Sequence, residues 1–218
     1  MAGSPRASRP SEPSLRSLVN FYDPSVNGLD ERHRTLDQIL AWRDSRLEIQ
    51  HDYIQILFPL PEGSVYSFMA PVIDEETFLY WRQHDELKEN MRRALKRMLA
   101  FYGFEIKWEK SESGERLVEI TEGADCEEKF ARWVRRLNHN HLRITRIIRS
   151  LRVLGLEEEA RAFYDALVWT YDAYGQIGAS SIGFWQRAAI APLHIAPDGD
   201  EVEWLEKYEV TQGSSDGI

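Results

Sequence analysis

Apolar side chains recur every three to four residues along most of this chain, and this helical periodicity constrains its fold more than any other feature. The segment "RTLDQILAWRDSRL" at 34–47 places Leu36, Ile39, Leu40 and Leu47 at spacings of three, four and seven residues. This pattern predicts an amphipathic helix with one apolar face turned toward a core.

Proline, aspartate and glycine residues mark where further helices end. The run "HDYIQILFPLP" predicts a short helix that ends before Pro59, because proline disfavours helical geometry in the residue before it. In the next periodic segment, Asp74 is a candidate N-cap and Gly103 a candidate C-terminal stop. Later helices are predicted over 127–155, 156–175 and 180–190.

From 104 to 121 the apolar spacing changes from helical to alternating. Phe104, Ile106 and Trp108 alternate with charged residues, "SESG" is typical of a turn, and "RLVEIT" follows, so we expect a β-hairpin at about 104–121. The sequence therefore predicts an all-α fold: a compact multi-helix domain with one small β-hairpin. We expect a single helical domain over 15–210, between two disordered tails at 1–14 and 211–218.

Composition excludes several classes of protein. A net charge of −9 argues against a general nucleic-acid binder, whose surface is basic. Cys126 is the only cysteine, so no intramolecular disulfide can form, which suits an intracellular, reducing compartment. No apolar run approaches the roughly 18 residues that a membrane span needs.

The stretch "NHNHLRITRIIRSL" at 138–151 raises the question of a metal site. Histidines two residues apart point roughly 200° away from each other on a helix, so His139 and His141 cannot bind one metal together. We expect no metal and no cofactor. Two interpretations stay open for Asn140 and His141: they bond backbone groups of a neighbouring loop, or they are polar anchors on the wall of a pocket. Both predict buried, hydrogen-bonded side chains.

Three blocks in this chain, "HDYIQILFPL", "MLAFYGFEI" and "NHNHLRITRIIRSLRVLGL", closely resemble the conserved region of the opioid growth factor receptor family, over roughly 19–190. The resemblance implies a largely helical domain, unrelated to seven-helix opioid receptors. In animals the family is associated with binding an enkephalin-type peptide at the nuclear envelope, which implies a cytoplasmic or nuclear location. Because the chain ends soon after the matching region, we expect a stand-alone member.

Aromatic density suggests where a ligand could bind. Tyrosine and tryptophan combine apolar area with one polar atom, which suits a pocket for a small molecule. The predicted ligand-binding residues are Tyr53, Phe58, Met98, Tyr102, Asn140, His141, Tyr164, Trp169 and Tyr171. A run of arginines at helical spacing is instead predicted to be a solvated face: Arg132, Arg135, Arg136, Arg143, Arg146, Arg149 and Arg152.

These features favour a receptor-like helical domain that binds a small, largely apolar or aromatic ligand, or a short peptide, in an internal pocket. One alternative is a cofactor-independent enzyme of small-molecule biosynthesis, such as an intramolecular cyclase of Diels–Alder type, which works by holding a reactive conformer. A second alternative is a protein-interaction scaffold. The sequence assigns no catalytic residue and no oligomeric state.

Overall fold

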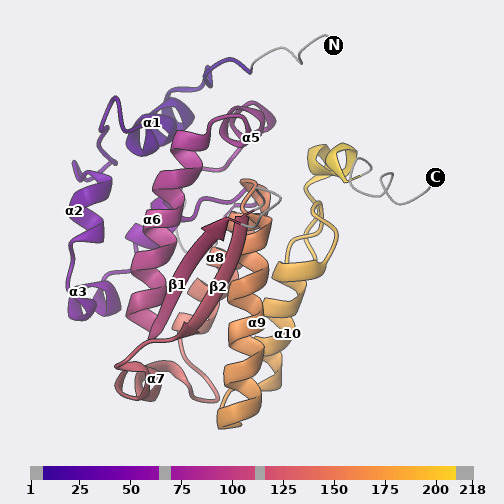
Figure 1. Cartoon of the computed structure of the whole chain (residues 1–218). Helices are drawn as coiled ribbons and strands as arrows, with labels where there is room; N and C mark the ends of the chain where they lie inside the picture. The colour runs from indigo at the N-terminus through magenta and orange to yellow at the C-terminus, as the bar shows by residue number, and fades with distance from the viewer. Residues whose placement is uncertain (1–6, 64–69, 111–115, 210–218) are drawn as a thin grey trace. The chain divides into compact units, whose positions relative to one another are not determined.

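The computed structural model describes residues 7–63, 70–110 and 116–209, and the chain divides into two compact units, Met1–Arg97 and Met98–Ile218 (Figure 1). The predicted all-α class is confirmed, with one antiparallel hairpin among the described residues. The single domain over 15–210 stays a prediction. The predicted tail at 211–218 lies outside the described residues, and so do residues 1–6 of the predicted tail at 1–14.

The first unit is built from short helices and most of one long helix. They are α1 (Pro13–Tyr22), α2 (Leu36–Leu40), α3 (Asp44–Ile49), α4 (Tyr53–Leu57), α5 (Glu75–Arg82) and α6 (Asp85–Tyr102), whose last turn belongs to the second unit. Helix α1 begins inside the segment predicted as a tail. Glu12 caps it by accepting from Leu15 N at 3.1 Å, and Leu18 and Val19 bury its apolar face.

The helix predicted over 34–47 is two helices, α2 and α3, separated by a turn at 41–43. The turn exposes carbonyl groups that a continuous helix would have bonded internally. Arg97 of α6 satisfies them: its guanidinium donates to Leu40 O at 3.2 Å, to Trp42 O at 2.6 Å and to Asp44 Oδ1 at 2.7 Å. A contact more than fifty residues away in sequence therefore stabilises the break.

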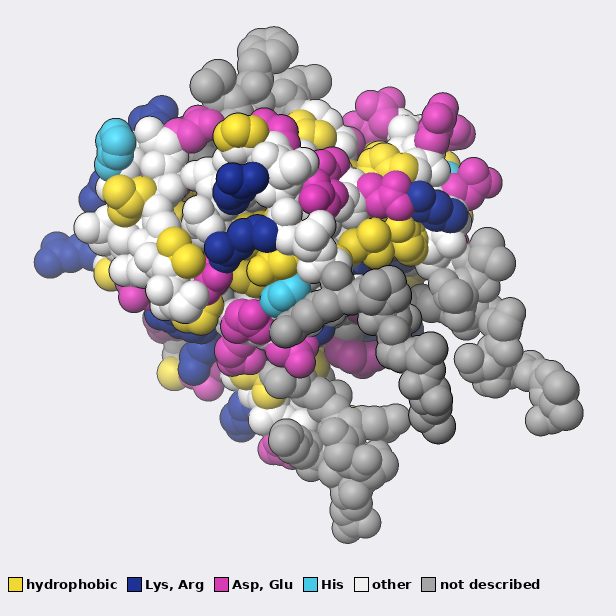
Figure 2. All heavy atoms as spheres, turned by 90° about the horizontal axis from the view of Figure 1, so that it is seen from above, with side chains coloured by type: hydrophobic (Ala, Val, Ile, Leu, Met, Phe, Trp, Pro, Cys, Tyr) yellow, Lys and Arg dark blue, Asp and Glu magenta, His cyan; other side chains and the backbone are white. Residues whose placement is uncertain are grey.

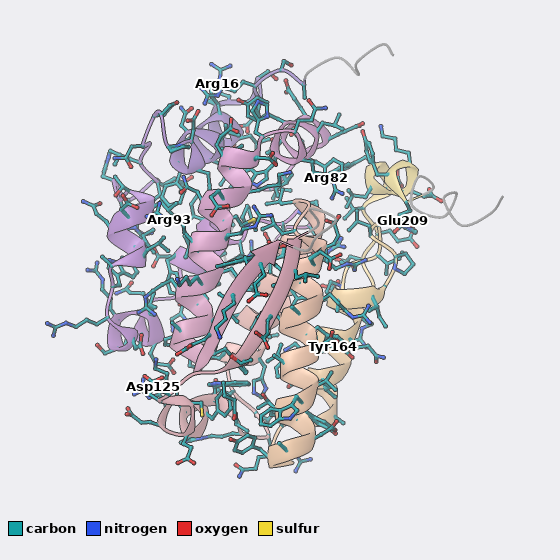
Figure 3. All side chains as sticks on the ribbon, in the orientation of Figure 1. Arg16, Arg82, Arg93, Asp125, Tyr164 and Glu209 are labelled. Carbon is teal, nitrogen blue, oxygen red and sulfur yellow. The ribbon has the colours of Figure 1, made fainter. Side chains whose placement is uncertain are left out.

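Helix ends elsewhere follow the predicted signals. Asp74 caps α5, since its Oδ1 accepts from Thr77 N at 2.8 Å. Gly103 ends α6 with a φ of 101°, a backbone conformation that residues with a Cβ rarely adopt. On the exposed side of α6, Arg93 pairs with Asp37 of α2 at 2.6 Å (Figure 3).

The second unit places the hairpin beside a layer of helices. Its elements are β1 (Phe104–Lys110), β2 (Arg116–Glu122), α7 (Cys126–Trp133), α8 (Asn140–Val153), α9 (Glu157–Tyr174), α10 (Ala179–Ile190) and the 3₁₀ helix η1 (Glu203–Tyr208). Helices α8, α9 and α10 pack against one another, and β2 packs on α9 (Figure 1). Trp108 Nε1 donates to Glu159 of α9 at 3.3 Å, and so ties the hairpin to this layer.

The core of the second unit is aromatic. Trp133 of α7 lies within 6.4 Å, centroid to centroid, of the rings of Tyr102, Phe130, His141 and Trp185. Edge-to-face pairs of this kind add about 0.5–1.5 kcal/mol beyond the burial of area. The Trp133 indole also donates to Tyr102 O at 2.9 Å, so its one polar atom is satisfied.

The surface carries both signs of charge. In Figure 2, Lys and Arg side chains lie among Asp and Glu, with hydrophobic side chains scattered between them. No helix within the described ranges is long and apolar enough to cross a membrane.

Candidate functional site

His141 at the start of α8 is a polar anchor within the core of the second unit. Its Nε2 lies 3.0 Å from Trp133 O and its Nδ1 lies 2.8 Å from Ser181 Oγ. Because a carbonyl can only accept, Nε2 carries the proton, and Nδ1 then accepts from the hydroxyl of Ser181. Burial lowers the pKa of His141, although the bond to Trp133 opposes the shift. The ring thus bonds a backbone carbonyl, as one of the two interpretations expected, but that carbonyl lies at the C-terminal end of helix α7 and not in a loop.

The arginines predicted as a solvated face lie partly inside the unit. Arg143 and Arg149 are 5 % and 1 % exposed. Arg149 donates to Leu193 O at 2.7 Å and Arg152 to Ala188 O at 3.0 Å, while Asn140 Oδ1 accepts from Arg143 at 3.1 Å. Burial lowers the pKa of Arg152, and the neighbouring Arg149 lowers it further. The solvated-face prediction is thus wrong for Arg143 and Arg149, which are buried; Arg149 and Arg152 bind backbone carbonyls, and Arg143 binds the Asn140 side chain.

The predicted ligand-binding residues fall into two groups. Six of the nine are buried, with exposures of 5 % or less: Tyr53, Phe58, Met98, Tyr102, Asn140 and His141. Tyr164 (Figure 3) and Tyr171 are half-buried on α9, whereas Trp169 is 51 % exposed. Tyr102 and His141 meet at the Trp133 ring, as core residues do. A ligand pocket lined by all nine stays a prediction.

The first unit contains a cavity of about 240 Å³, which the sequence did not indicate. Four separate stretches of chain line it: α1, the loop before α2, α4 with its N-cap, and the segment before α5. The lining residues are Ser14, Ser17, Leu18, Asp30, Glu31, Arg32, Arg34, Asp52, Gln55, Ile56, Ala70 and Pro71.

A charge network forms one wall of this cavity. Arg34 donates through Nε to Asp30 Oδ2 at 2.7 Å, and its Nη2 lies 2.6 Å from both Asp30 Oδ2 and Asp52 Oδ2. Arg32 reaches the same oxygen of Asp52 from 3.2 Å. Burial works to lower the pKa of Arg34, but its bonds with the two aspartates outweigh that effect and raise it. Arg34 therefore stays charged and fixes this wall.

Gln55 of α4 adds a further polar side chain to the lining of the cavity. It is 9 % exposed. Leu18, Ile56 and Pro71 provide apolar surface in the same cavity. A polar residue inside the otherwise apolar run "YIQIL" is the sequence signal for this position, and aromatic density does not detect it.

The opioid growth factor receptor (OGFr) conserved region matches residues 17–170 of this chain. The chain belongs to the opioid growth factor receptor family. The matched range includes all of the cavity-lining residues except Ser14. Across the described part of the chain, no group of three or more His, Cys, Asp and Glu side chains is placed to hold a metal ion.

Curated relatives within the family are similar over part of their length. The opioid growth factor receptor of Rattus norvegicus is 37% identical over 127 residues, which cover 56% of this chain and 20% of the relative. The Homo sapiens receptor is 34% identical over 141 residues, which cover 64% of this chain and 20% of that receptor. Opioid growth factor receptor-like protein 1 of Xenopus tropicalis is 33% identical over 147 residues, which cover 66% of this chain and 26% of that protein. The chain thus spans about a fifth to a quarter of these relatives, and no solved structure matches it.

Proposed function

We propose that this chain is a receptor-like binding module, and that its ligand occupies the cavity of the first unit. The observation that carries the proposal is a cavity of about 240 Å³, lined by the side chain of Gln55 and by apolar residues, that lies almost wholly within the family's conserved region. A hydrogen bond between a ligand and the Gln55 amide would contribute about 1 kcal/mol and fix the orientation of the ligand.

The lining supports a small ligand with an apolar part and a few directional contacts. A largely apolar or aromatic small molecule fits this description, and so does one end of a short peptide. The printed names of the relatives describe receptors for an opioid growth factor, and the proposal extends a ligand of that kind to this chain. An intracellular location, cytoplasmic or nuclear, belongs to the same proposal. The cyclase and scaffold alternatives stay predictions.

The test is a nuclear magnetic resonance titration of the full chain with two probes: an enkephalin-type pentapeptide and a set of small aromatic fragments. We expect at least one probe to shift the side-chain NH₂ signals of Gln55 and the signals around Leu18. The variant Gln55→Met keeps the side-chain volume but removes the amide, and should weaken binding roughly tenfold. Trp169→Ala, on the exposed face of α9, is the matched control and should bind normally.

Shifts confined to the second unit, or binding that Gln55→Met leaves unchanged, would contradict the proposed site. If Trp169→Ala weakened binding and Gln55→Met did not, the aromatic residues predicted from the sequence would be the better assignment.

A further inference from the structure

We propose that the cavity of the first unit selects ligands that carry a protonated primary amine beside a small apolar group. The free amino terminus of a peptide and a small aliphatic amine share this chemistry. The inference rests on the proposed function and names the class of ligand that the same site takes.

The charge of the lining points to a cation. Three carboxylates, those of Asp30, Glu31 and Asp52, face two guanidinium groups. Asp30 is fully engaged, because Oδ1 accepts from Arg32 N at 2.9 Å and Arg34 N at 2.8 Å while Oδ2 accepts from the Arg34 side chain. One negative charge of the lining therefore has no compensating cation within it.

Asp52 supplies the acceptor for that cation. Both of its ion pairs end on Oδ2, yet this oxygen is buried and accepts no well-aligned hydrogen bond from the described residues, so it can accept one from a ligand. An anionic ligand is disfavoured by the same geometry, because Arg34 is bound to two aspartates and would have to release one of them. Arg32 stands at the rim, with 66% of its side chain exposed.

Gln55 and the apolar wall define what surrounds the amine. Asp52 and Gln55 lie three residues apart at one turn of α4, so their side chains share a face. The carbonyl of a glutamine amide accepts from an ammonium, and its NH₂ donates to a carbonyl two bonds beyond. A volume of about 240 Å³ holds the equivalent of about eight liquid waters, enough for a branched aliphatic group and one amide.

The experiment compares two probes that differ in one group, leucinamide and 4-methylpentanamide, which has the same skeleton without the amine. At pH 6.5 the amine is protonated. Titration of the ¹⁵N-labelled full chain should show leucinamide shifting the Gln55 side-chain signals with about tenfold higher affinity than 4-methylpentanamide, as expected for a charged hydrogen bond.

Variants test which carboxylate carries the preference. Asp52→Asn should abolish the difference between the two probes, and Gln55→Glu should enlarge it several-fold. Glu86→Gln removes the same charge from an exposed position outside the cavity and should leave the ratio unchanged. Circular dichroism checks that each variant is folded; should Asp52→Asn not fold, Glu31→Gln takes its place and is expected to reduce the ratio.

The outcomes separate this inference from the proposed function. Equal affinity of the two probes at the Gln55 signals overturns the amine preference and leaves the ligand site standing. Absence of any shift at those signals, with either probe at saturating concentration, overturns both. If leucinamide binds more tightly than 4-methylpentanamide, leucylglycinamide identifies where the amine comes from. Tighter binding than leucinamide indicates a peptide amino terminus, and weaker binding indicates a small amine.

Discussion

Replacement of His141 by alanine should destabilise the protein by about 2–4 kcal/mol. Two hydrogen bonds are lost, from Nε2 to Trp133 O at 3.0 Å and from Ser181 Oγ to Nδ1 at 2.8 Å, each worth roughly 1 kcal/mol. The buried carbonyl of Trp133 and the half-buried hydroxyl of Ser181 then lose these partners. The ring also packs edge-to-face on Trp185 at 5.4 Å, so its removal leaves a cavity that adds to the cost.

Urea denaturation of the full chain, followed by tryptophan fluorescence, measures this loss directly, since Trp133 and Trp185 both flank the ring. His139→Ala is the matched control: His139 is exposed two residues earlier, and its replacement should change the free energy of unfolding by no more than about 0.5 kcal/mol. A stability unchanged in His141→Ala, together with lost ligand binding, would refute the structural role and make His141 a binding residue.

Three further outcomes are expected. The free energy of unfolding should fall as pH drops below about 6.5. The pKa of His141 is lowered in the folded chain, so the unfolded chain binds a proton there more readily. Denaturation curves at pH 7 and pH 5 should therefore differ less for His141→Gln than for the unmodified protein. Gly103→Ala should cost about 1–3 kcal/mol in a thermal melt, since the φ of 101° is strained for alanine and its Cβ would lie 3.1 Å from Phe130; an unchanged melt would contradict this. Cys126 should react more slowly with iodoacetamide at pH 8 than a free thiol does, because burial and then Glu122 raise its pKa, and rapid alkylation would count against that environment.

The sequence predicts the kinds of elements well where the signal is local. The alternation of Phe104, Ile106 and Trp108 predicted the hairpin, and β1 and β2 pair in one antiparallel register with Ile106 opposite Ile120. Asp74 and Gly103 act at helix ends through their own side chain or backbone, so neighbouring residues suffice to recognise them. Such signals need no knowledge of the tertiary fold.

Tertiary contacts decided what the periodicity could not. The break at 41–43 is stabilised by Arg97, which lies too far along the sequence for a local pattern around 41–43 to include it. Leu137 fits the apolar arc of α8 by its spacing, yet it is 83% exposed because the helix begins three residues later. Arg149 is buried because the carbonyl of Leu193, 44 residues later in the chain, accepts a hydrogen bond from its guanidinium.

The cavity could not be predicted for a related reason. Its polar wall joins Asp30 and Arg34 from a loop with Asp52 from the start of a helix, and only the folded unit brings these residues together. Each of them alone resembles an ordinary surface charge in an acidic chain. Of the aromatic residues predicted to bind a ligand, Tyr53, Phe58 and Tyr102 are buried, Tyr164 and Tyr171 are half-buried, and Trp169 is exposed.

Among the described residues, the two strands of the hairpin pair only with each other, so both are edges, and edge strands can pair with a second molecule. Its outward face carries Glu105, Lys107 and Glu119, with Lys107 directly opposite Glu119. A neighbouring strand that approached would have to desolvate these charges. Valine at 107 and 119 would leave the fold of the unit largely intact but remove that barrier, so the effect would show as aggregation during concentration and storage, before any change in a melting curve.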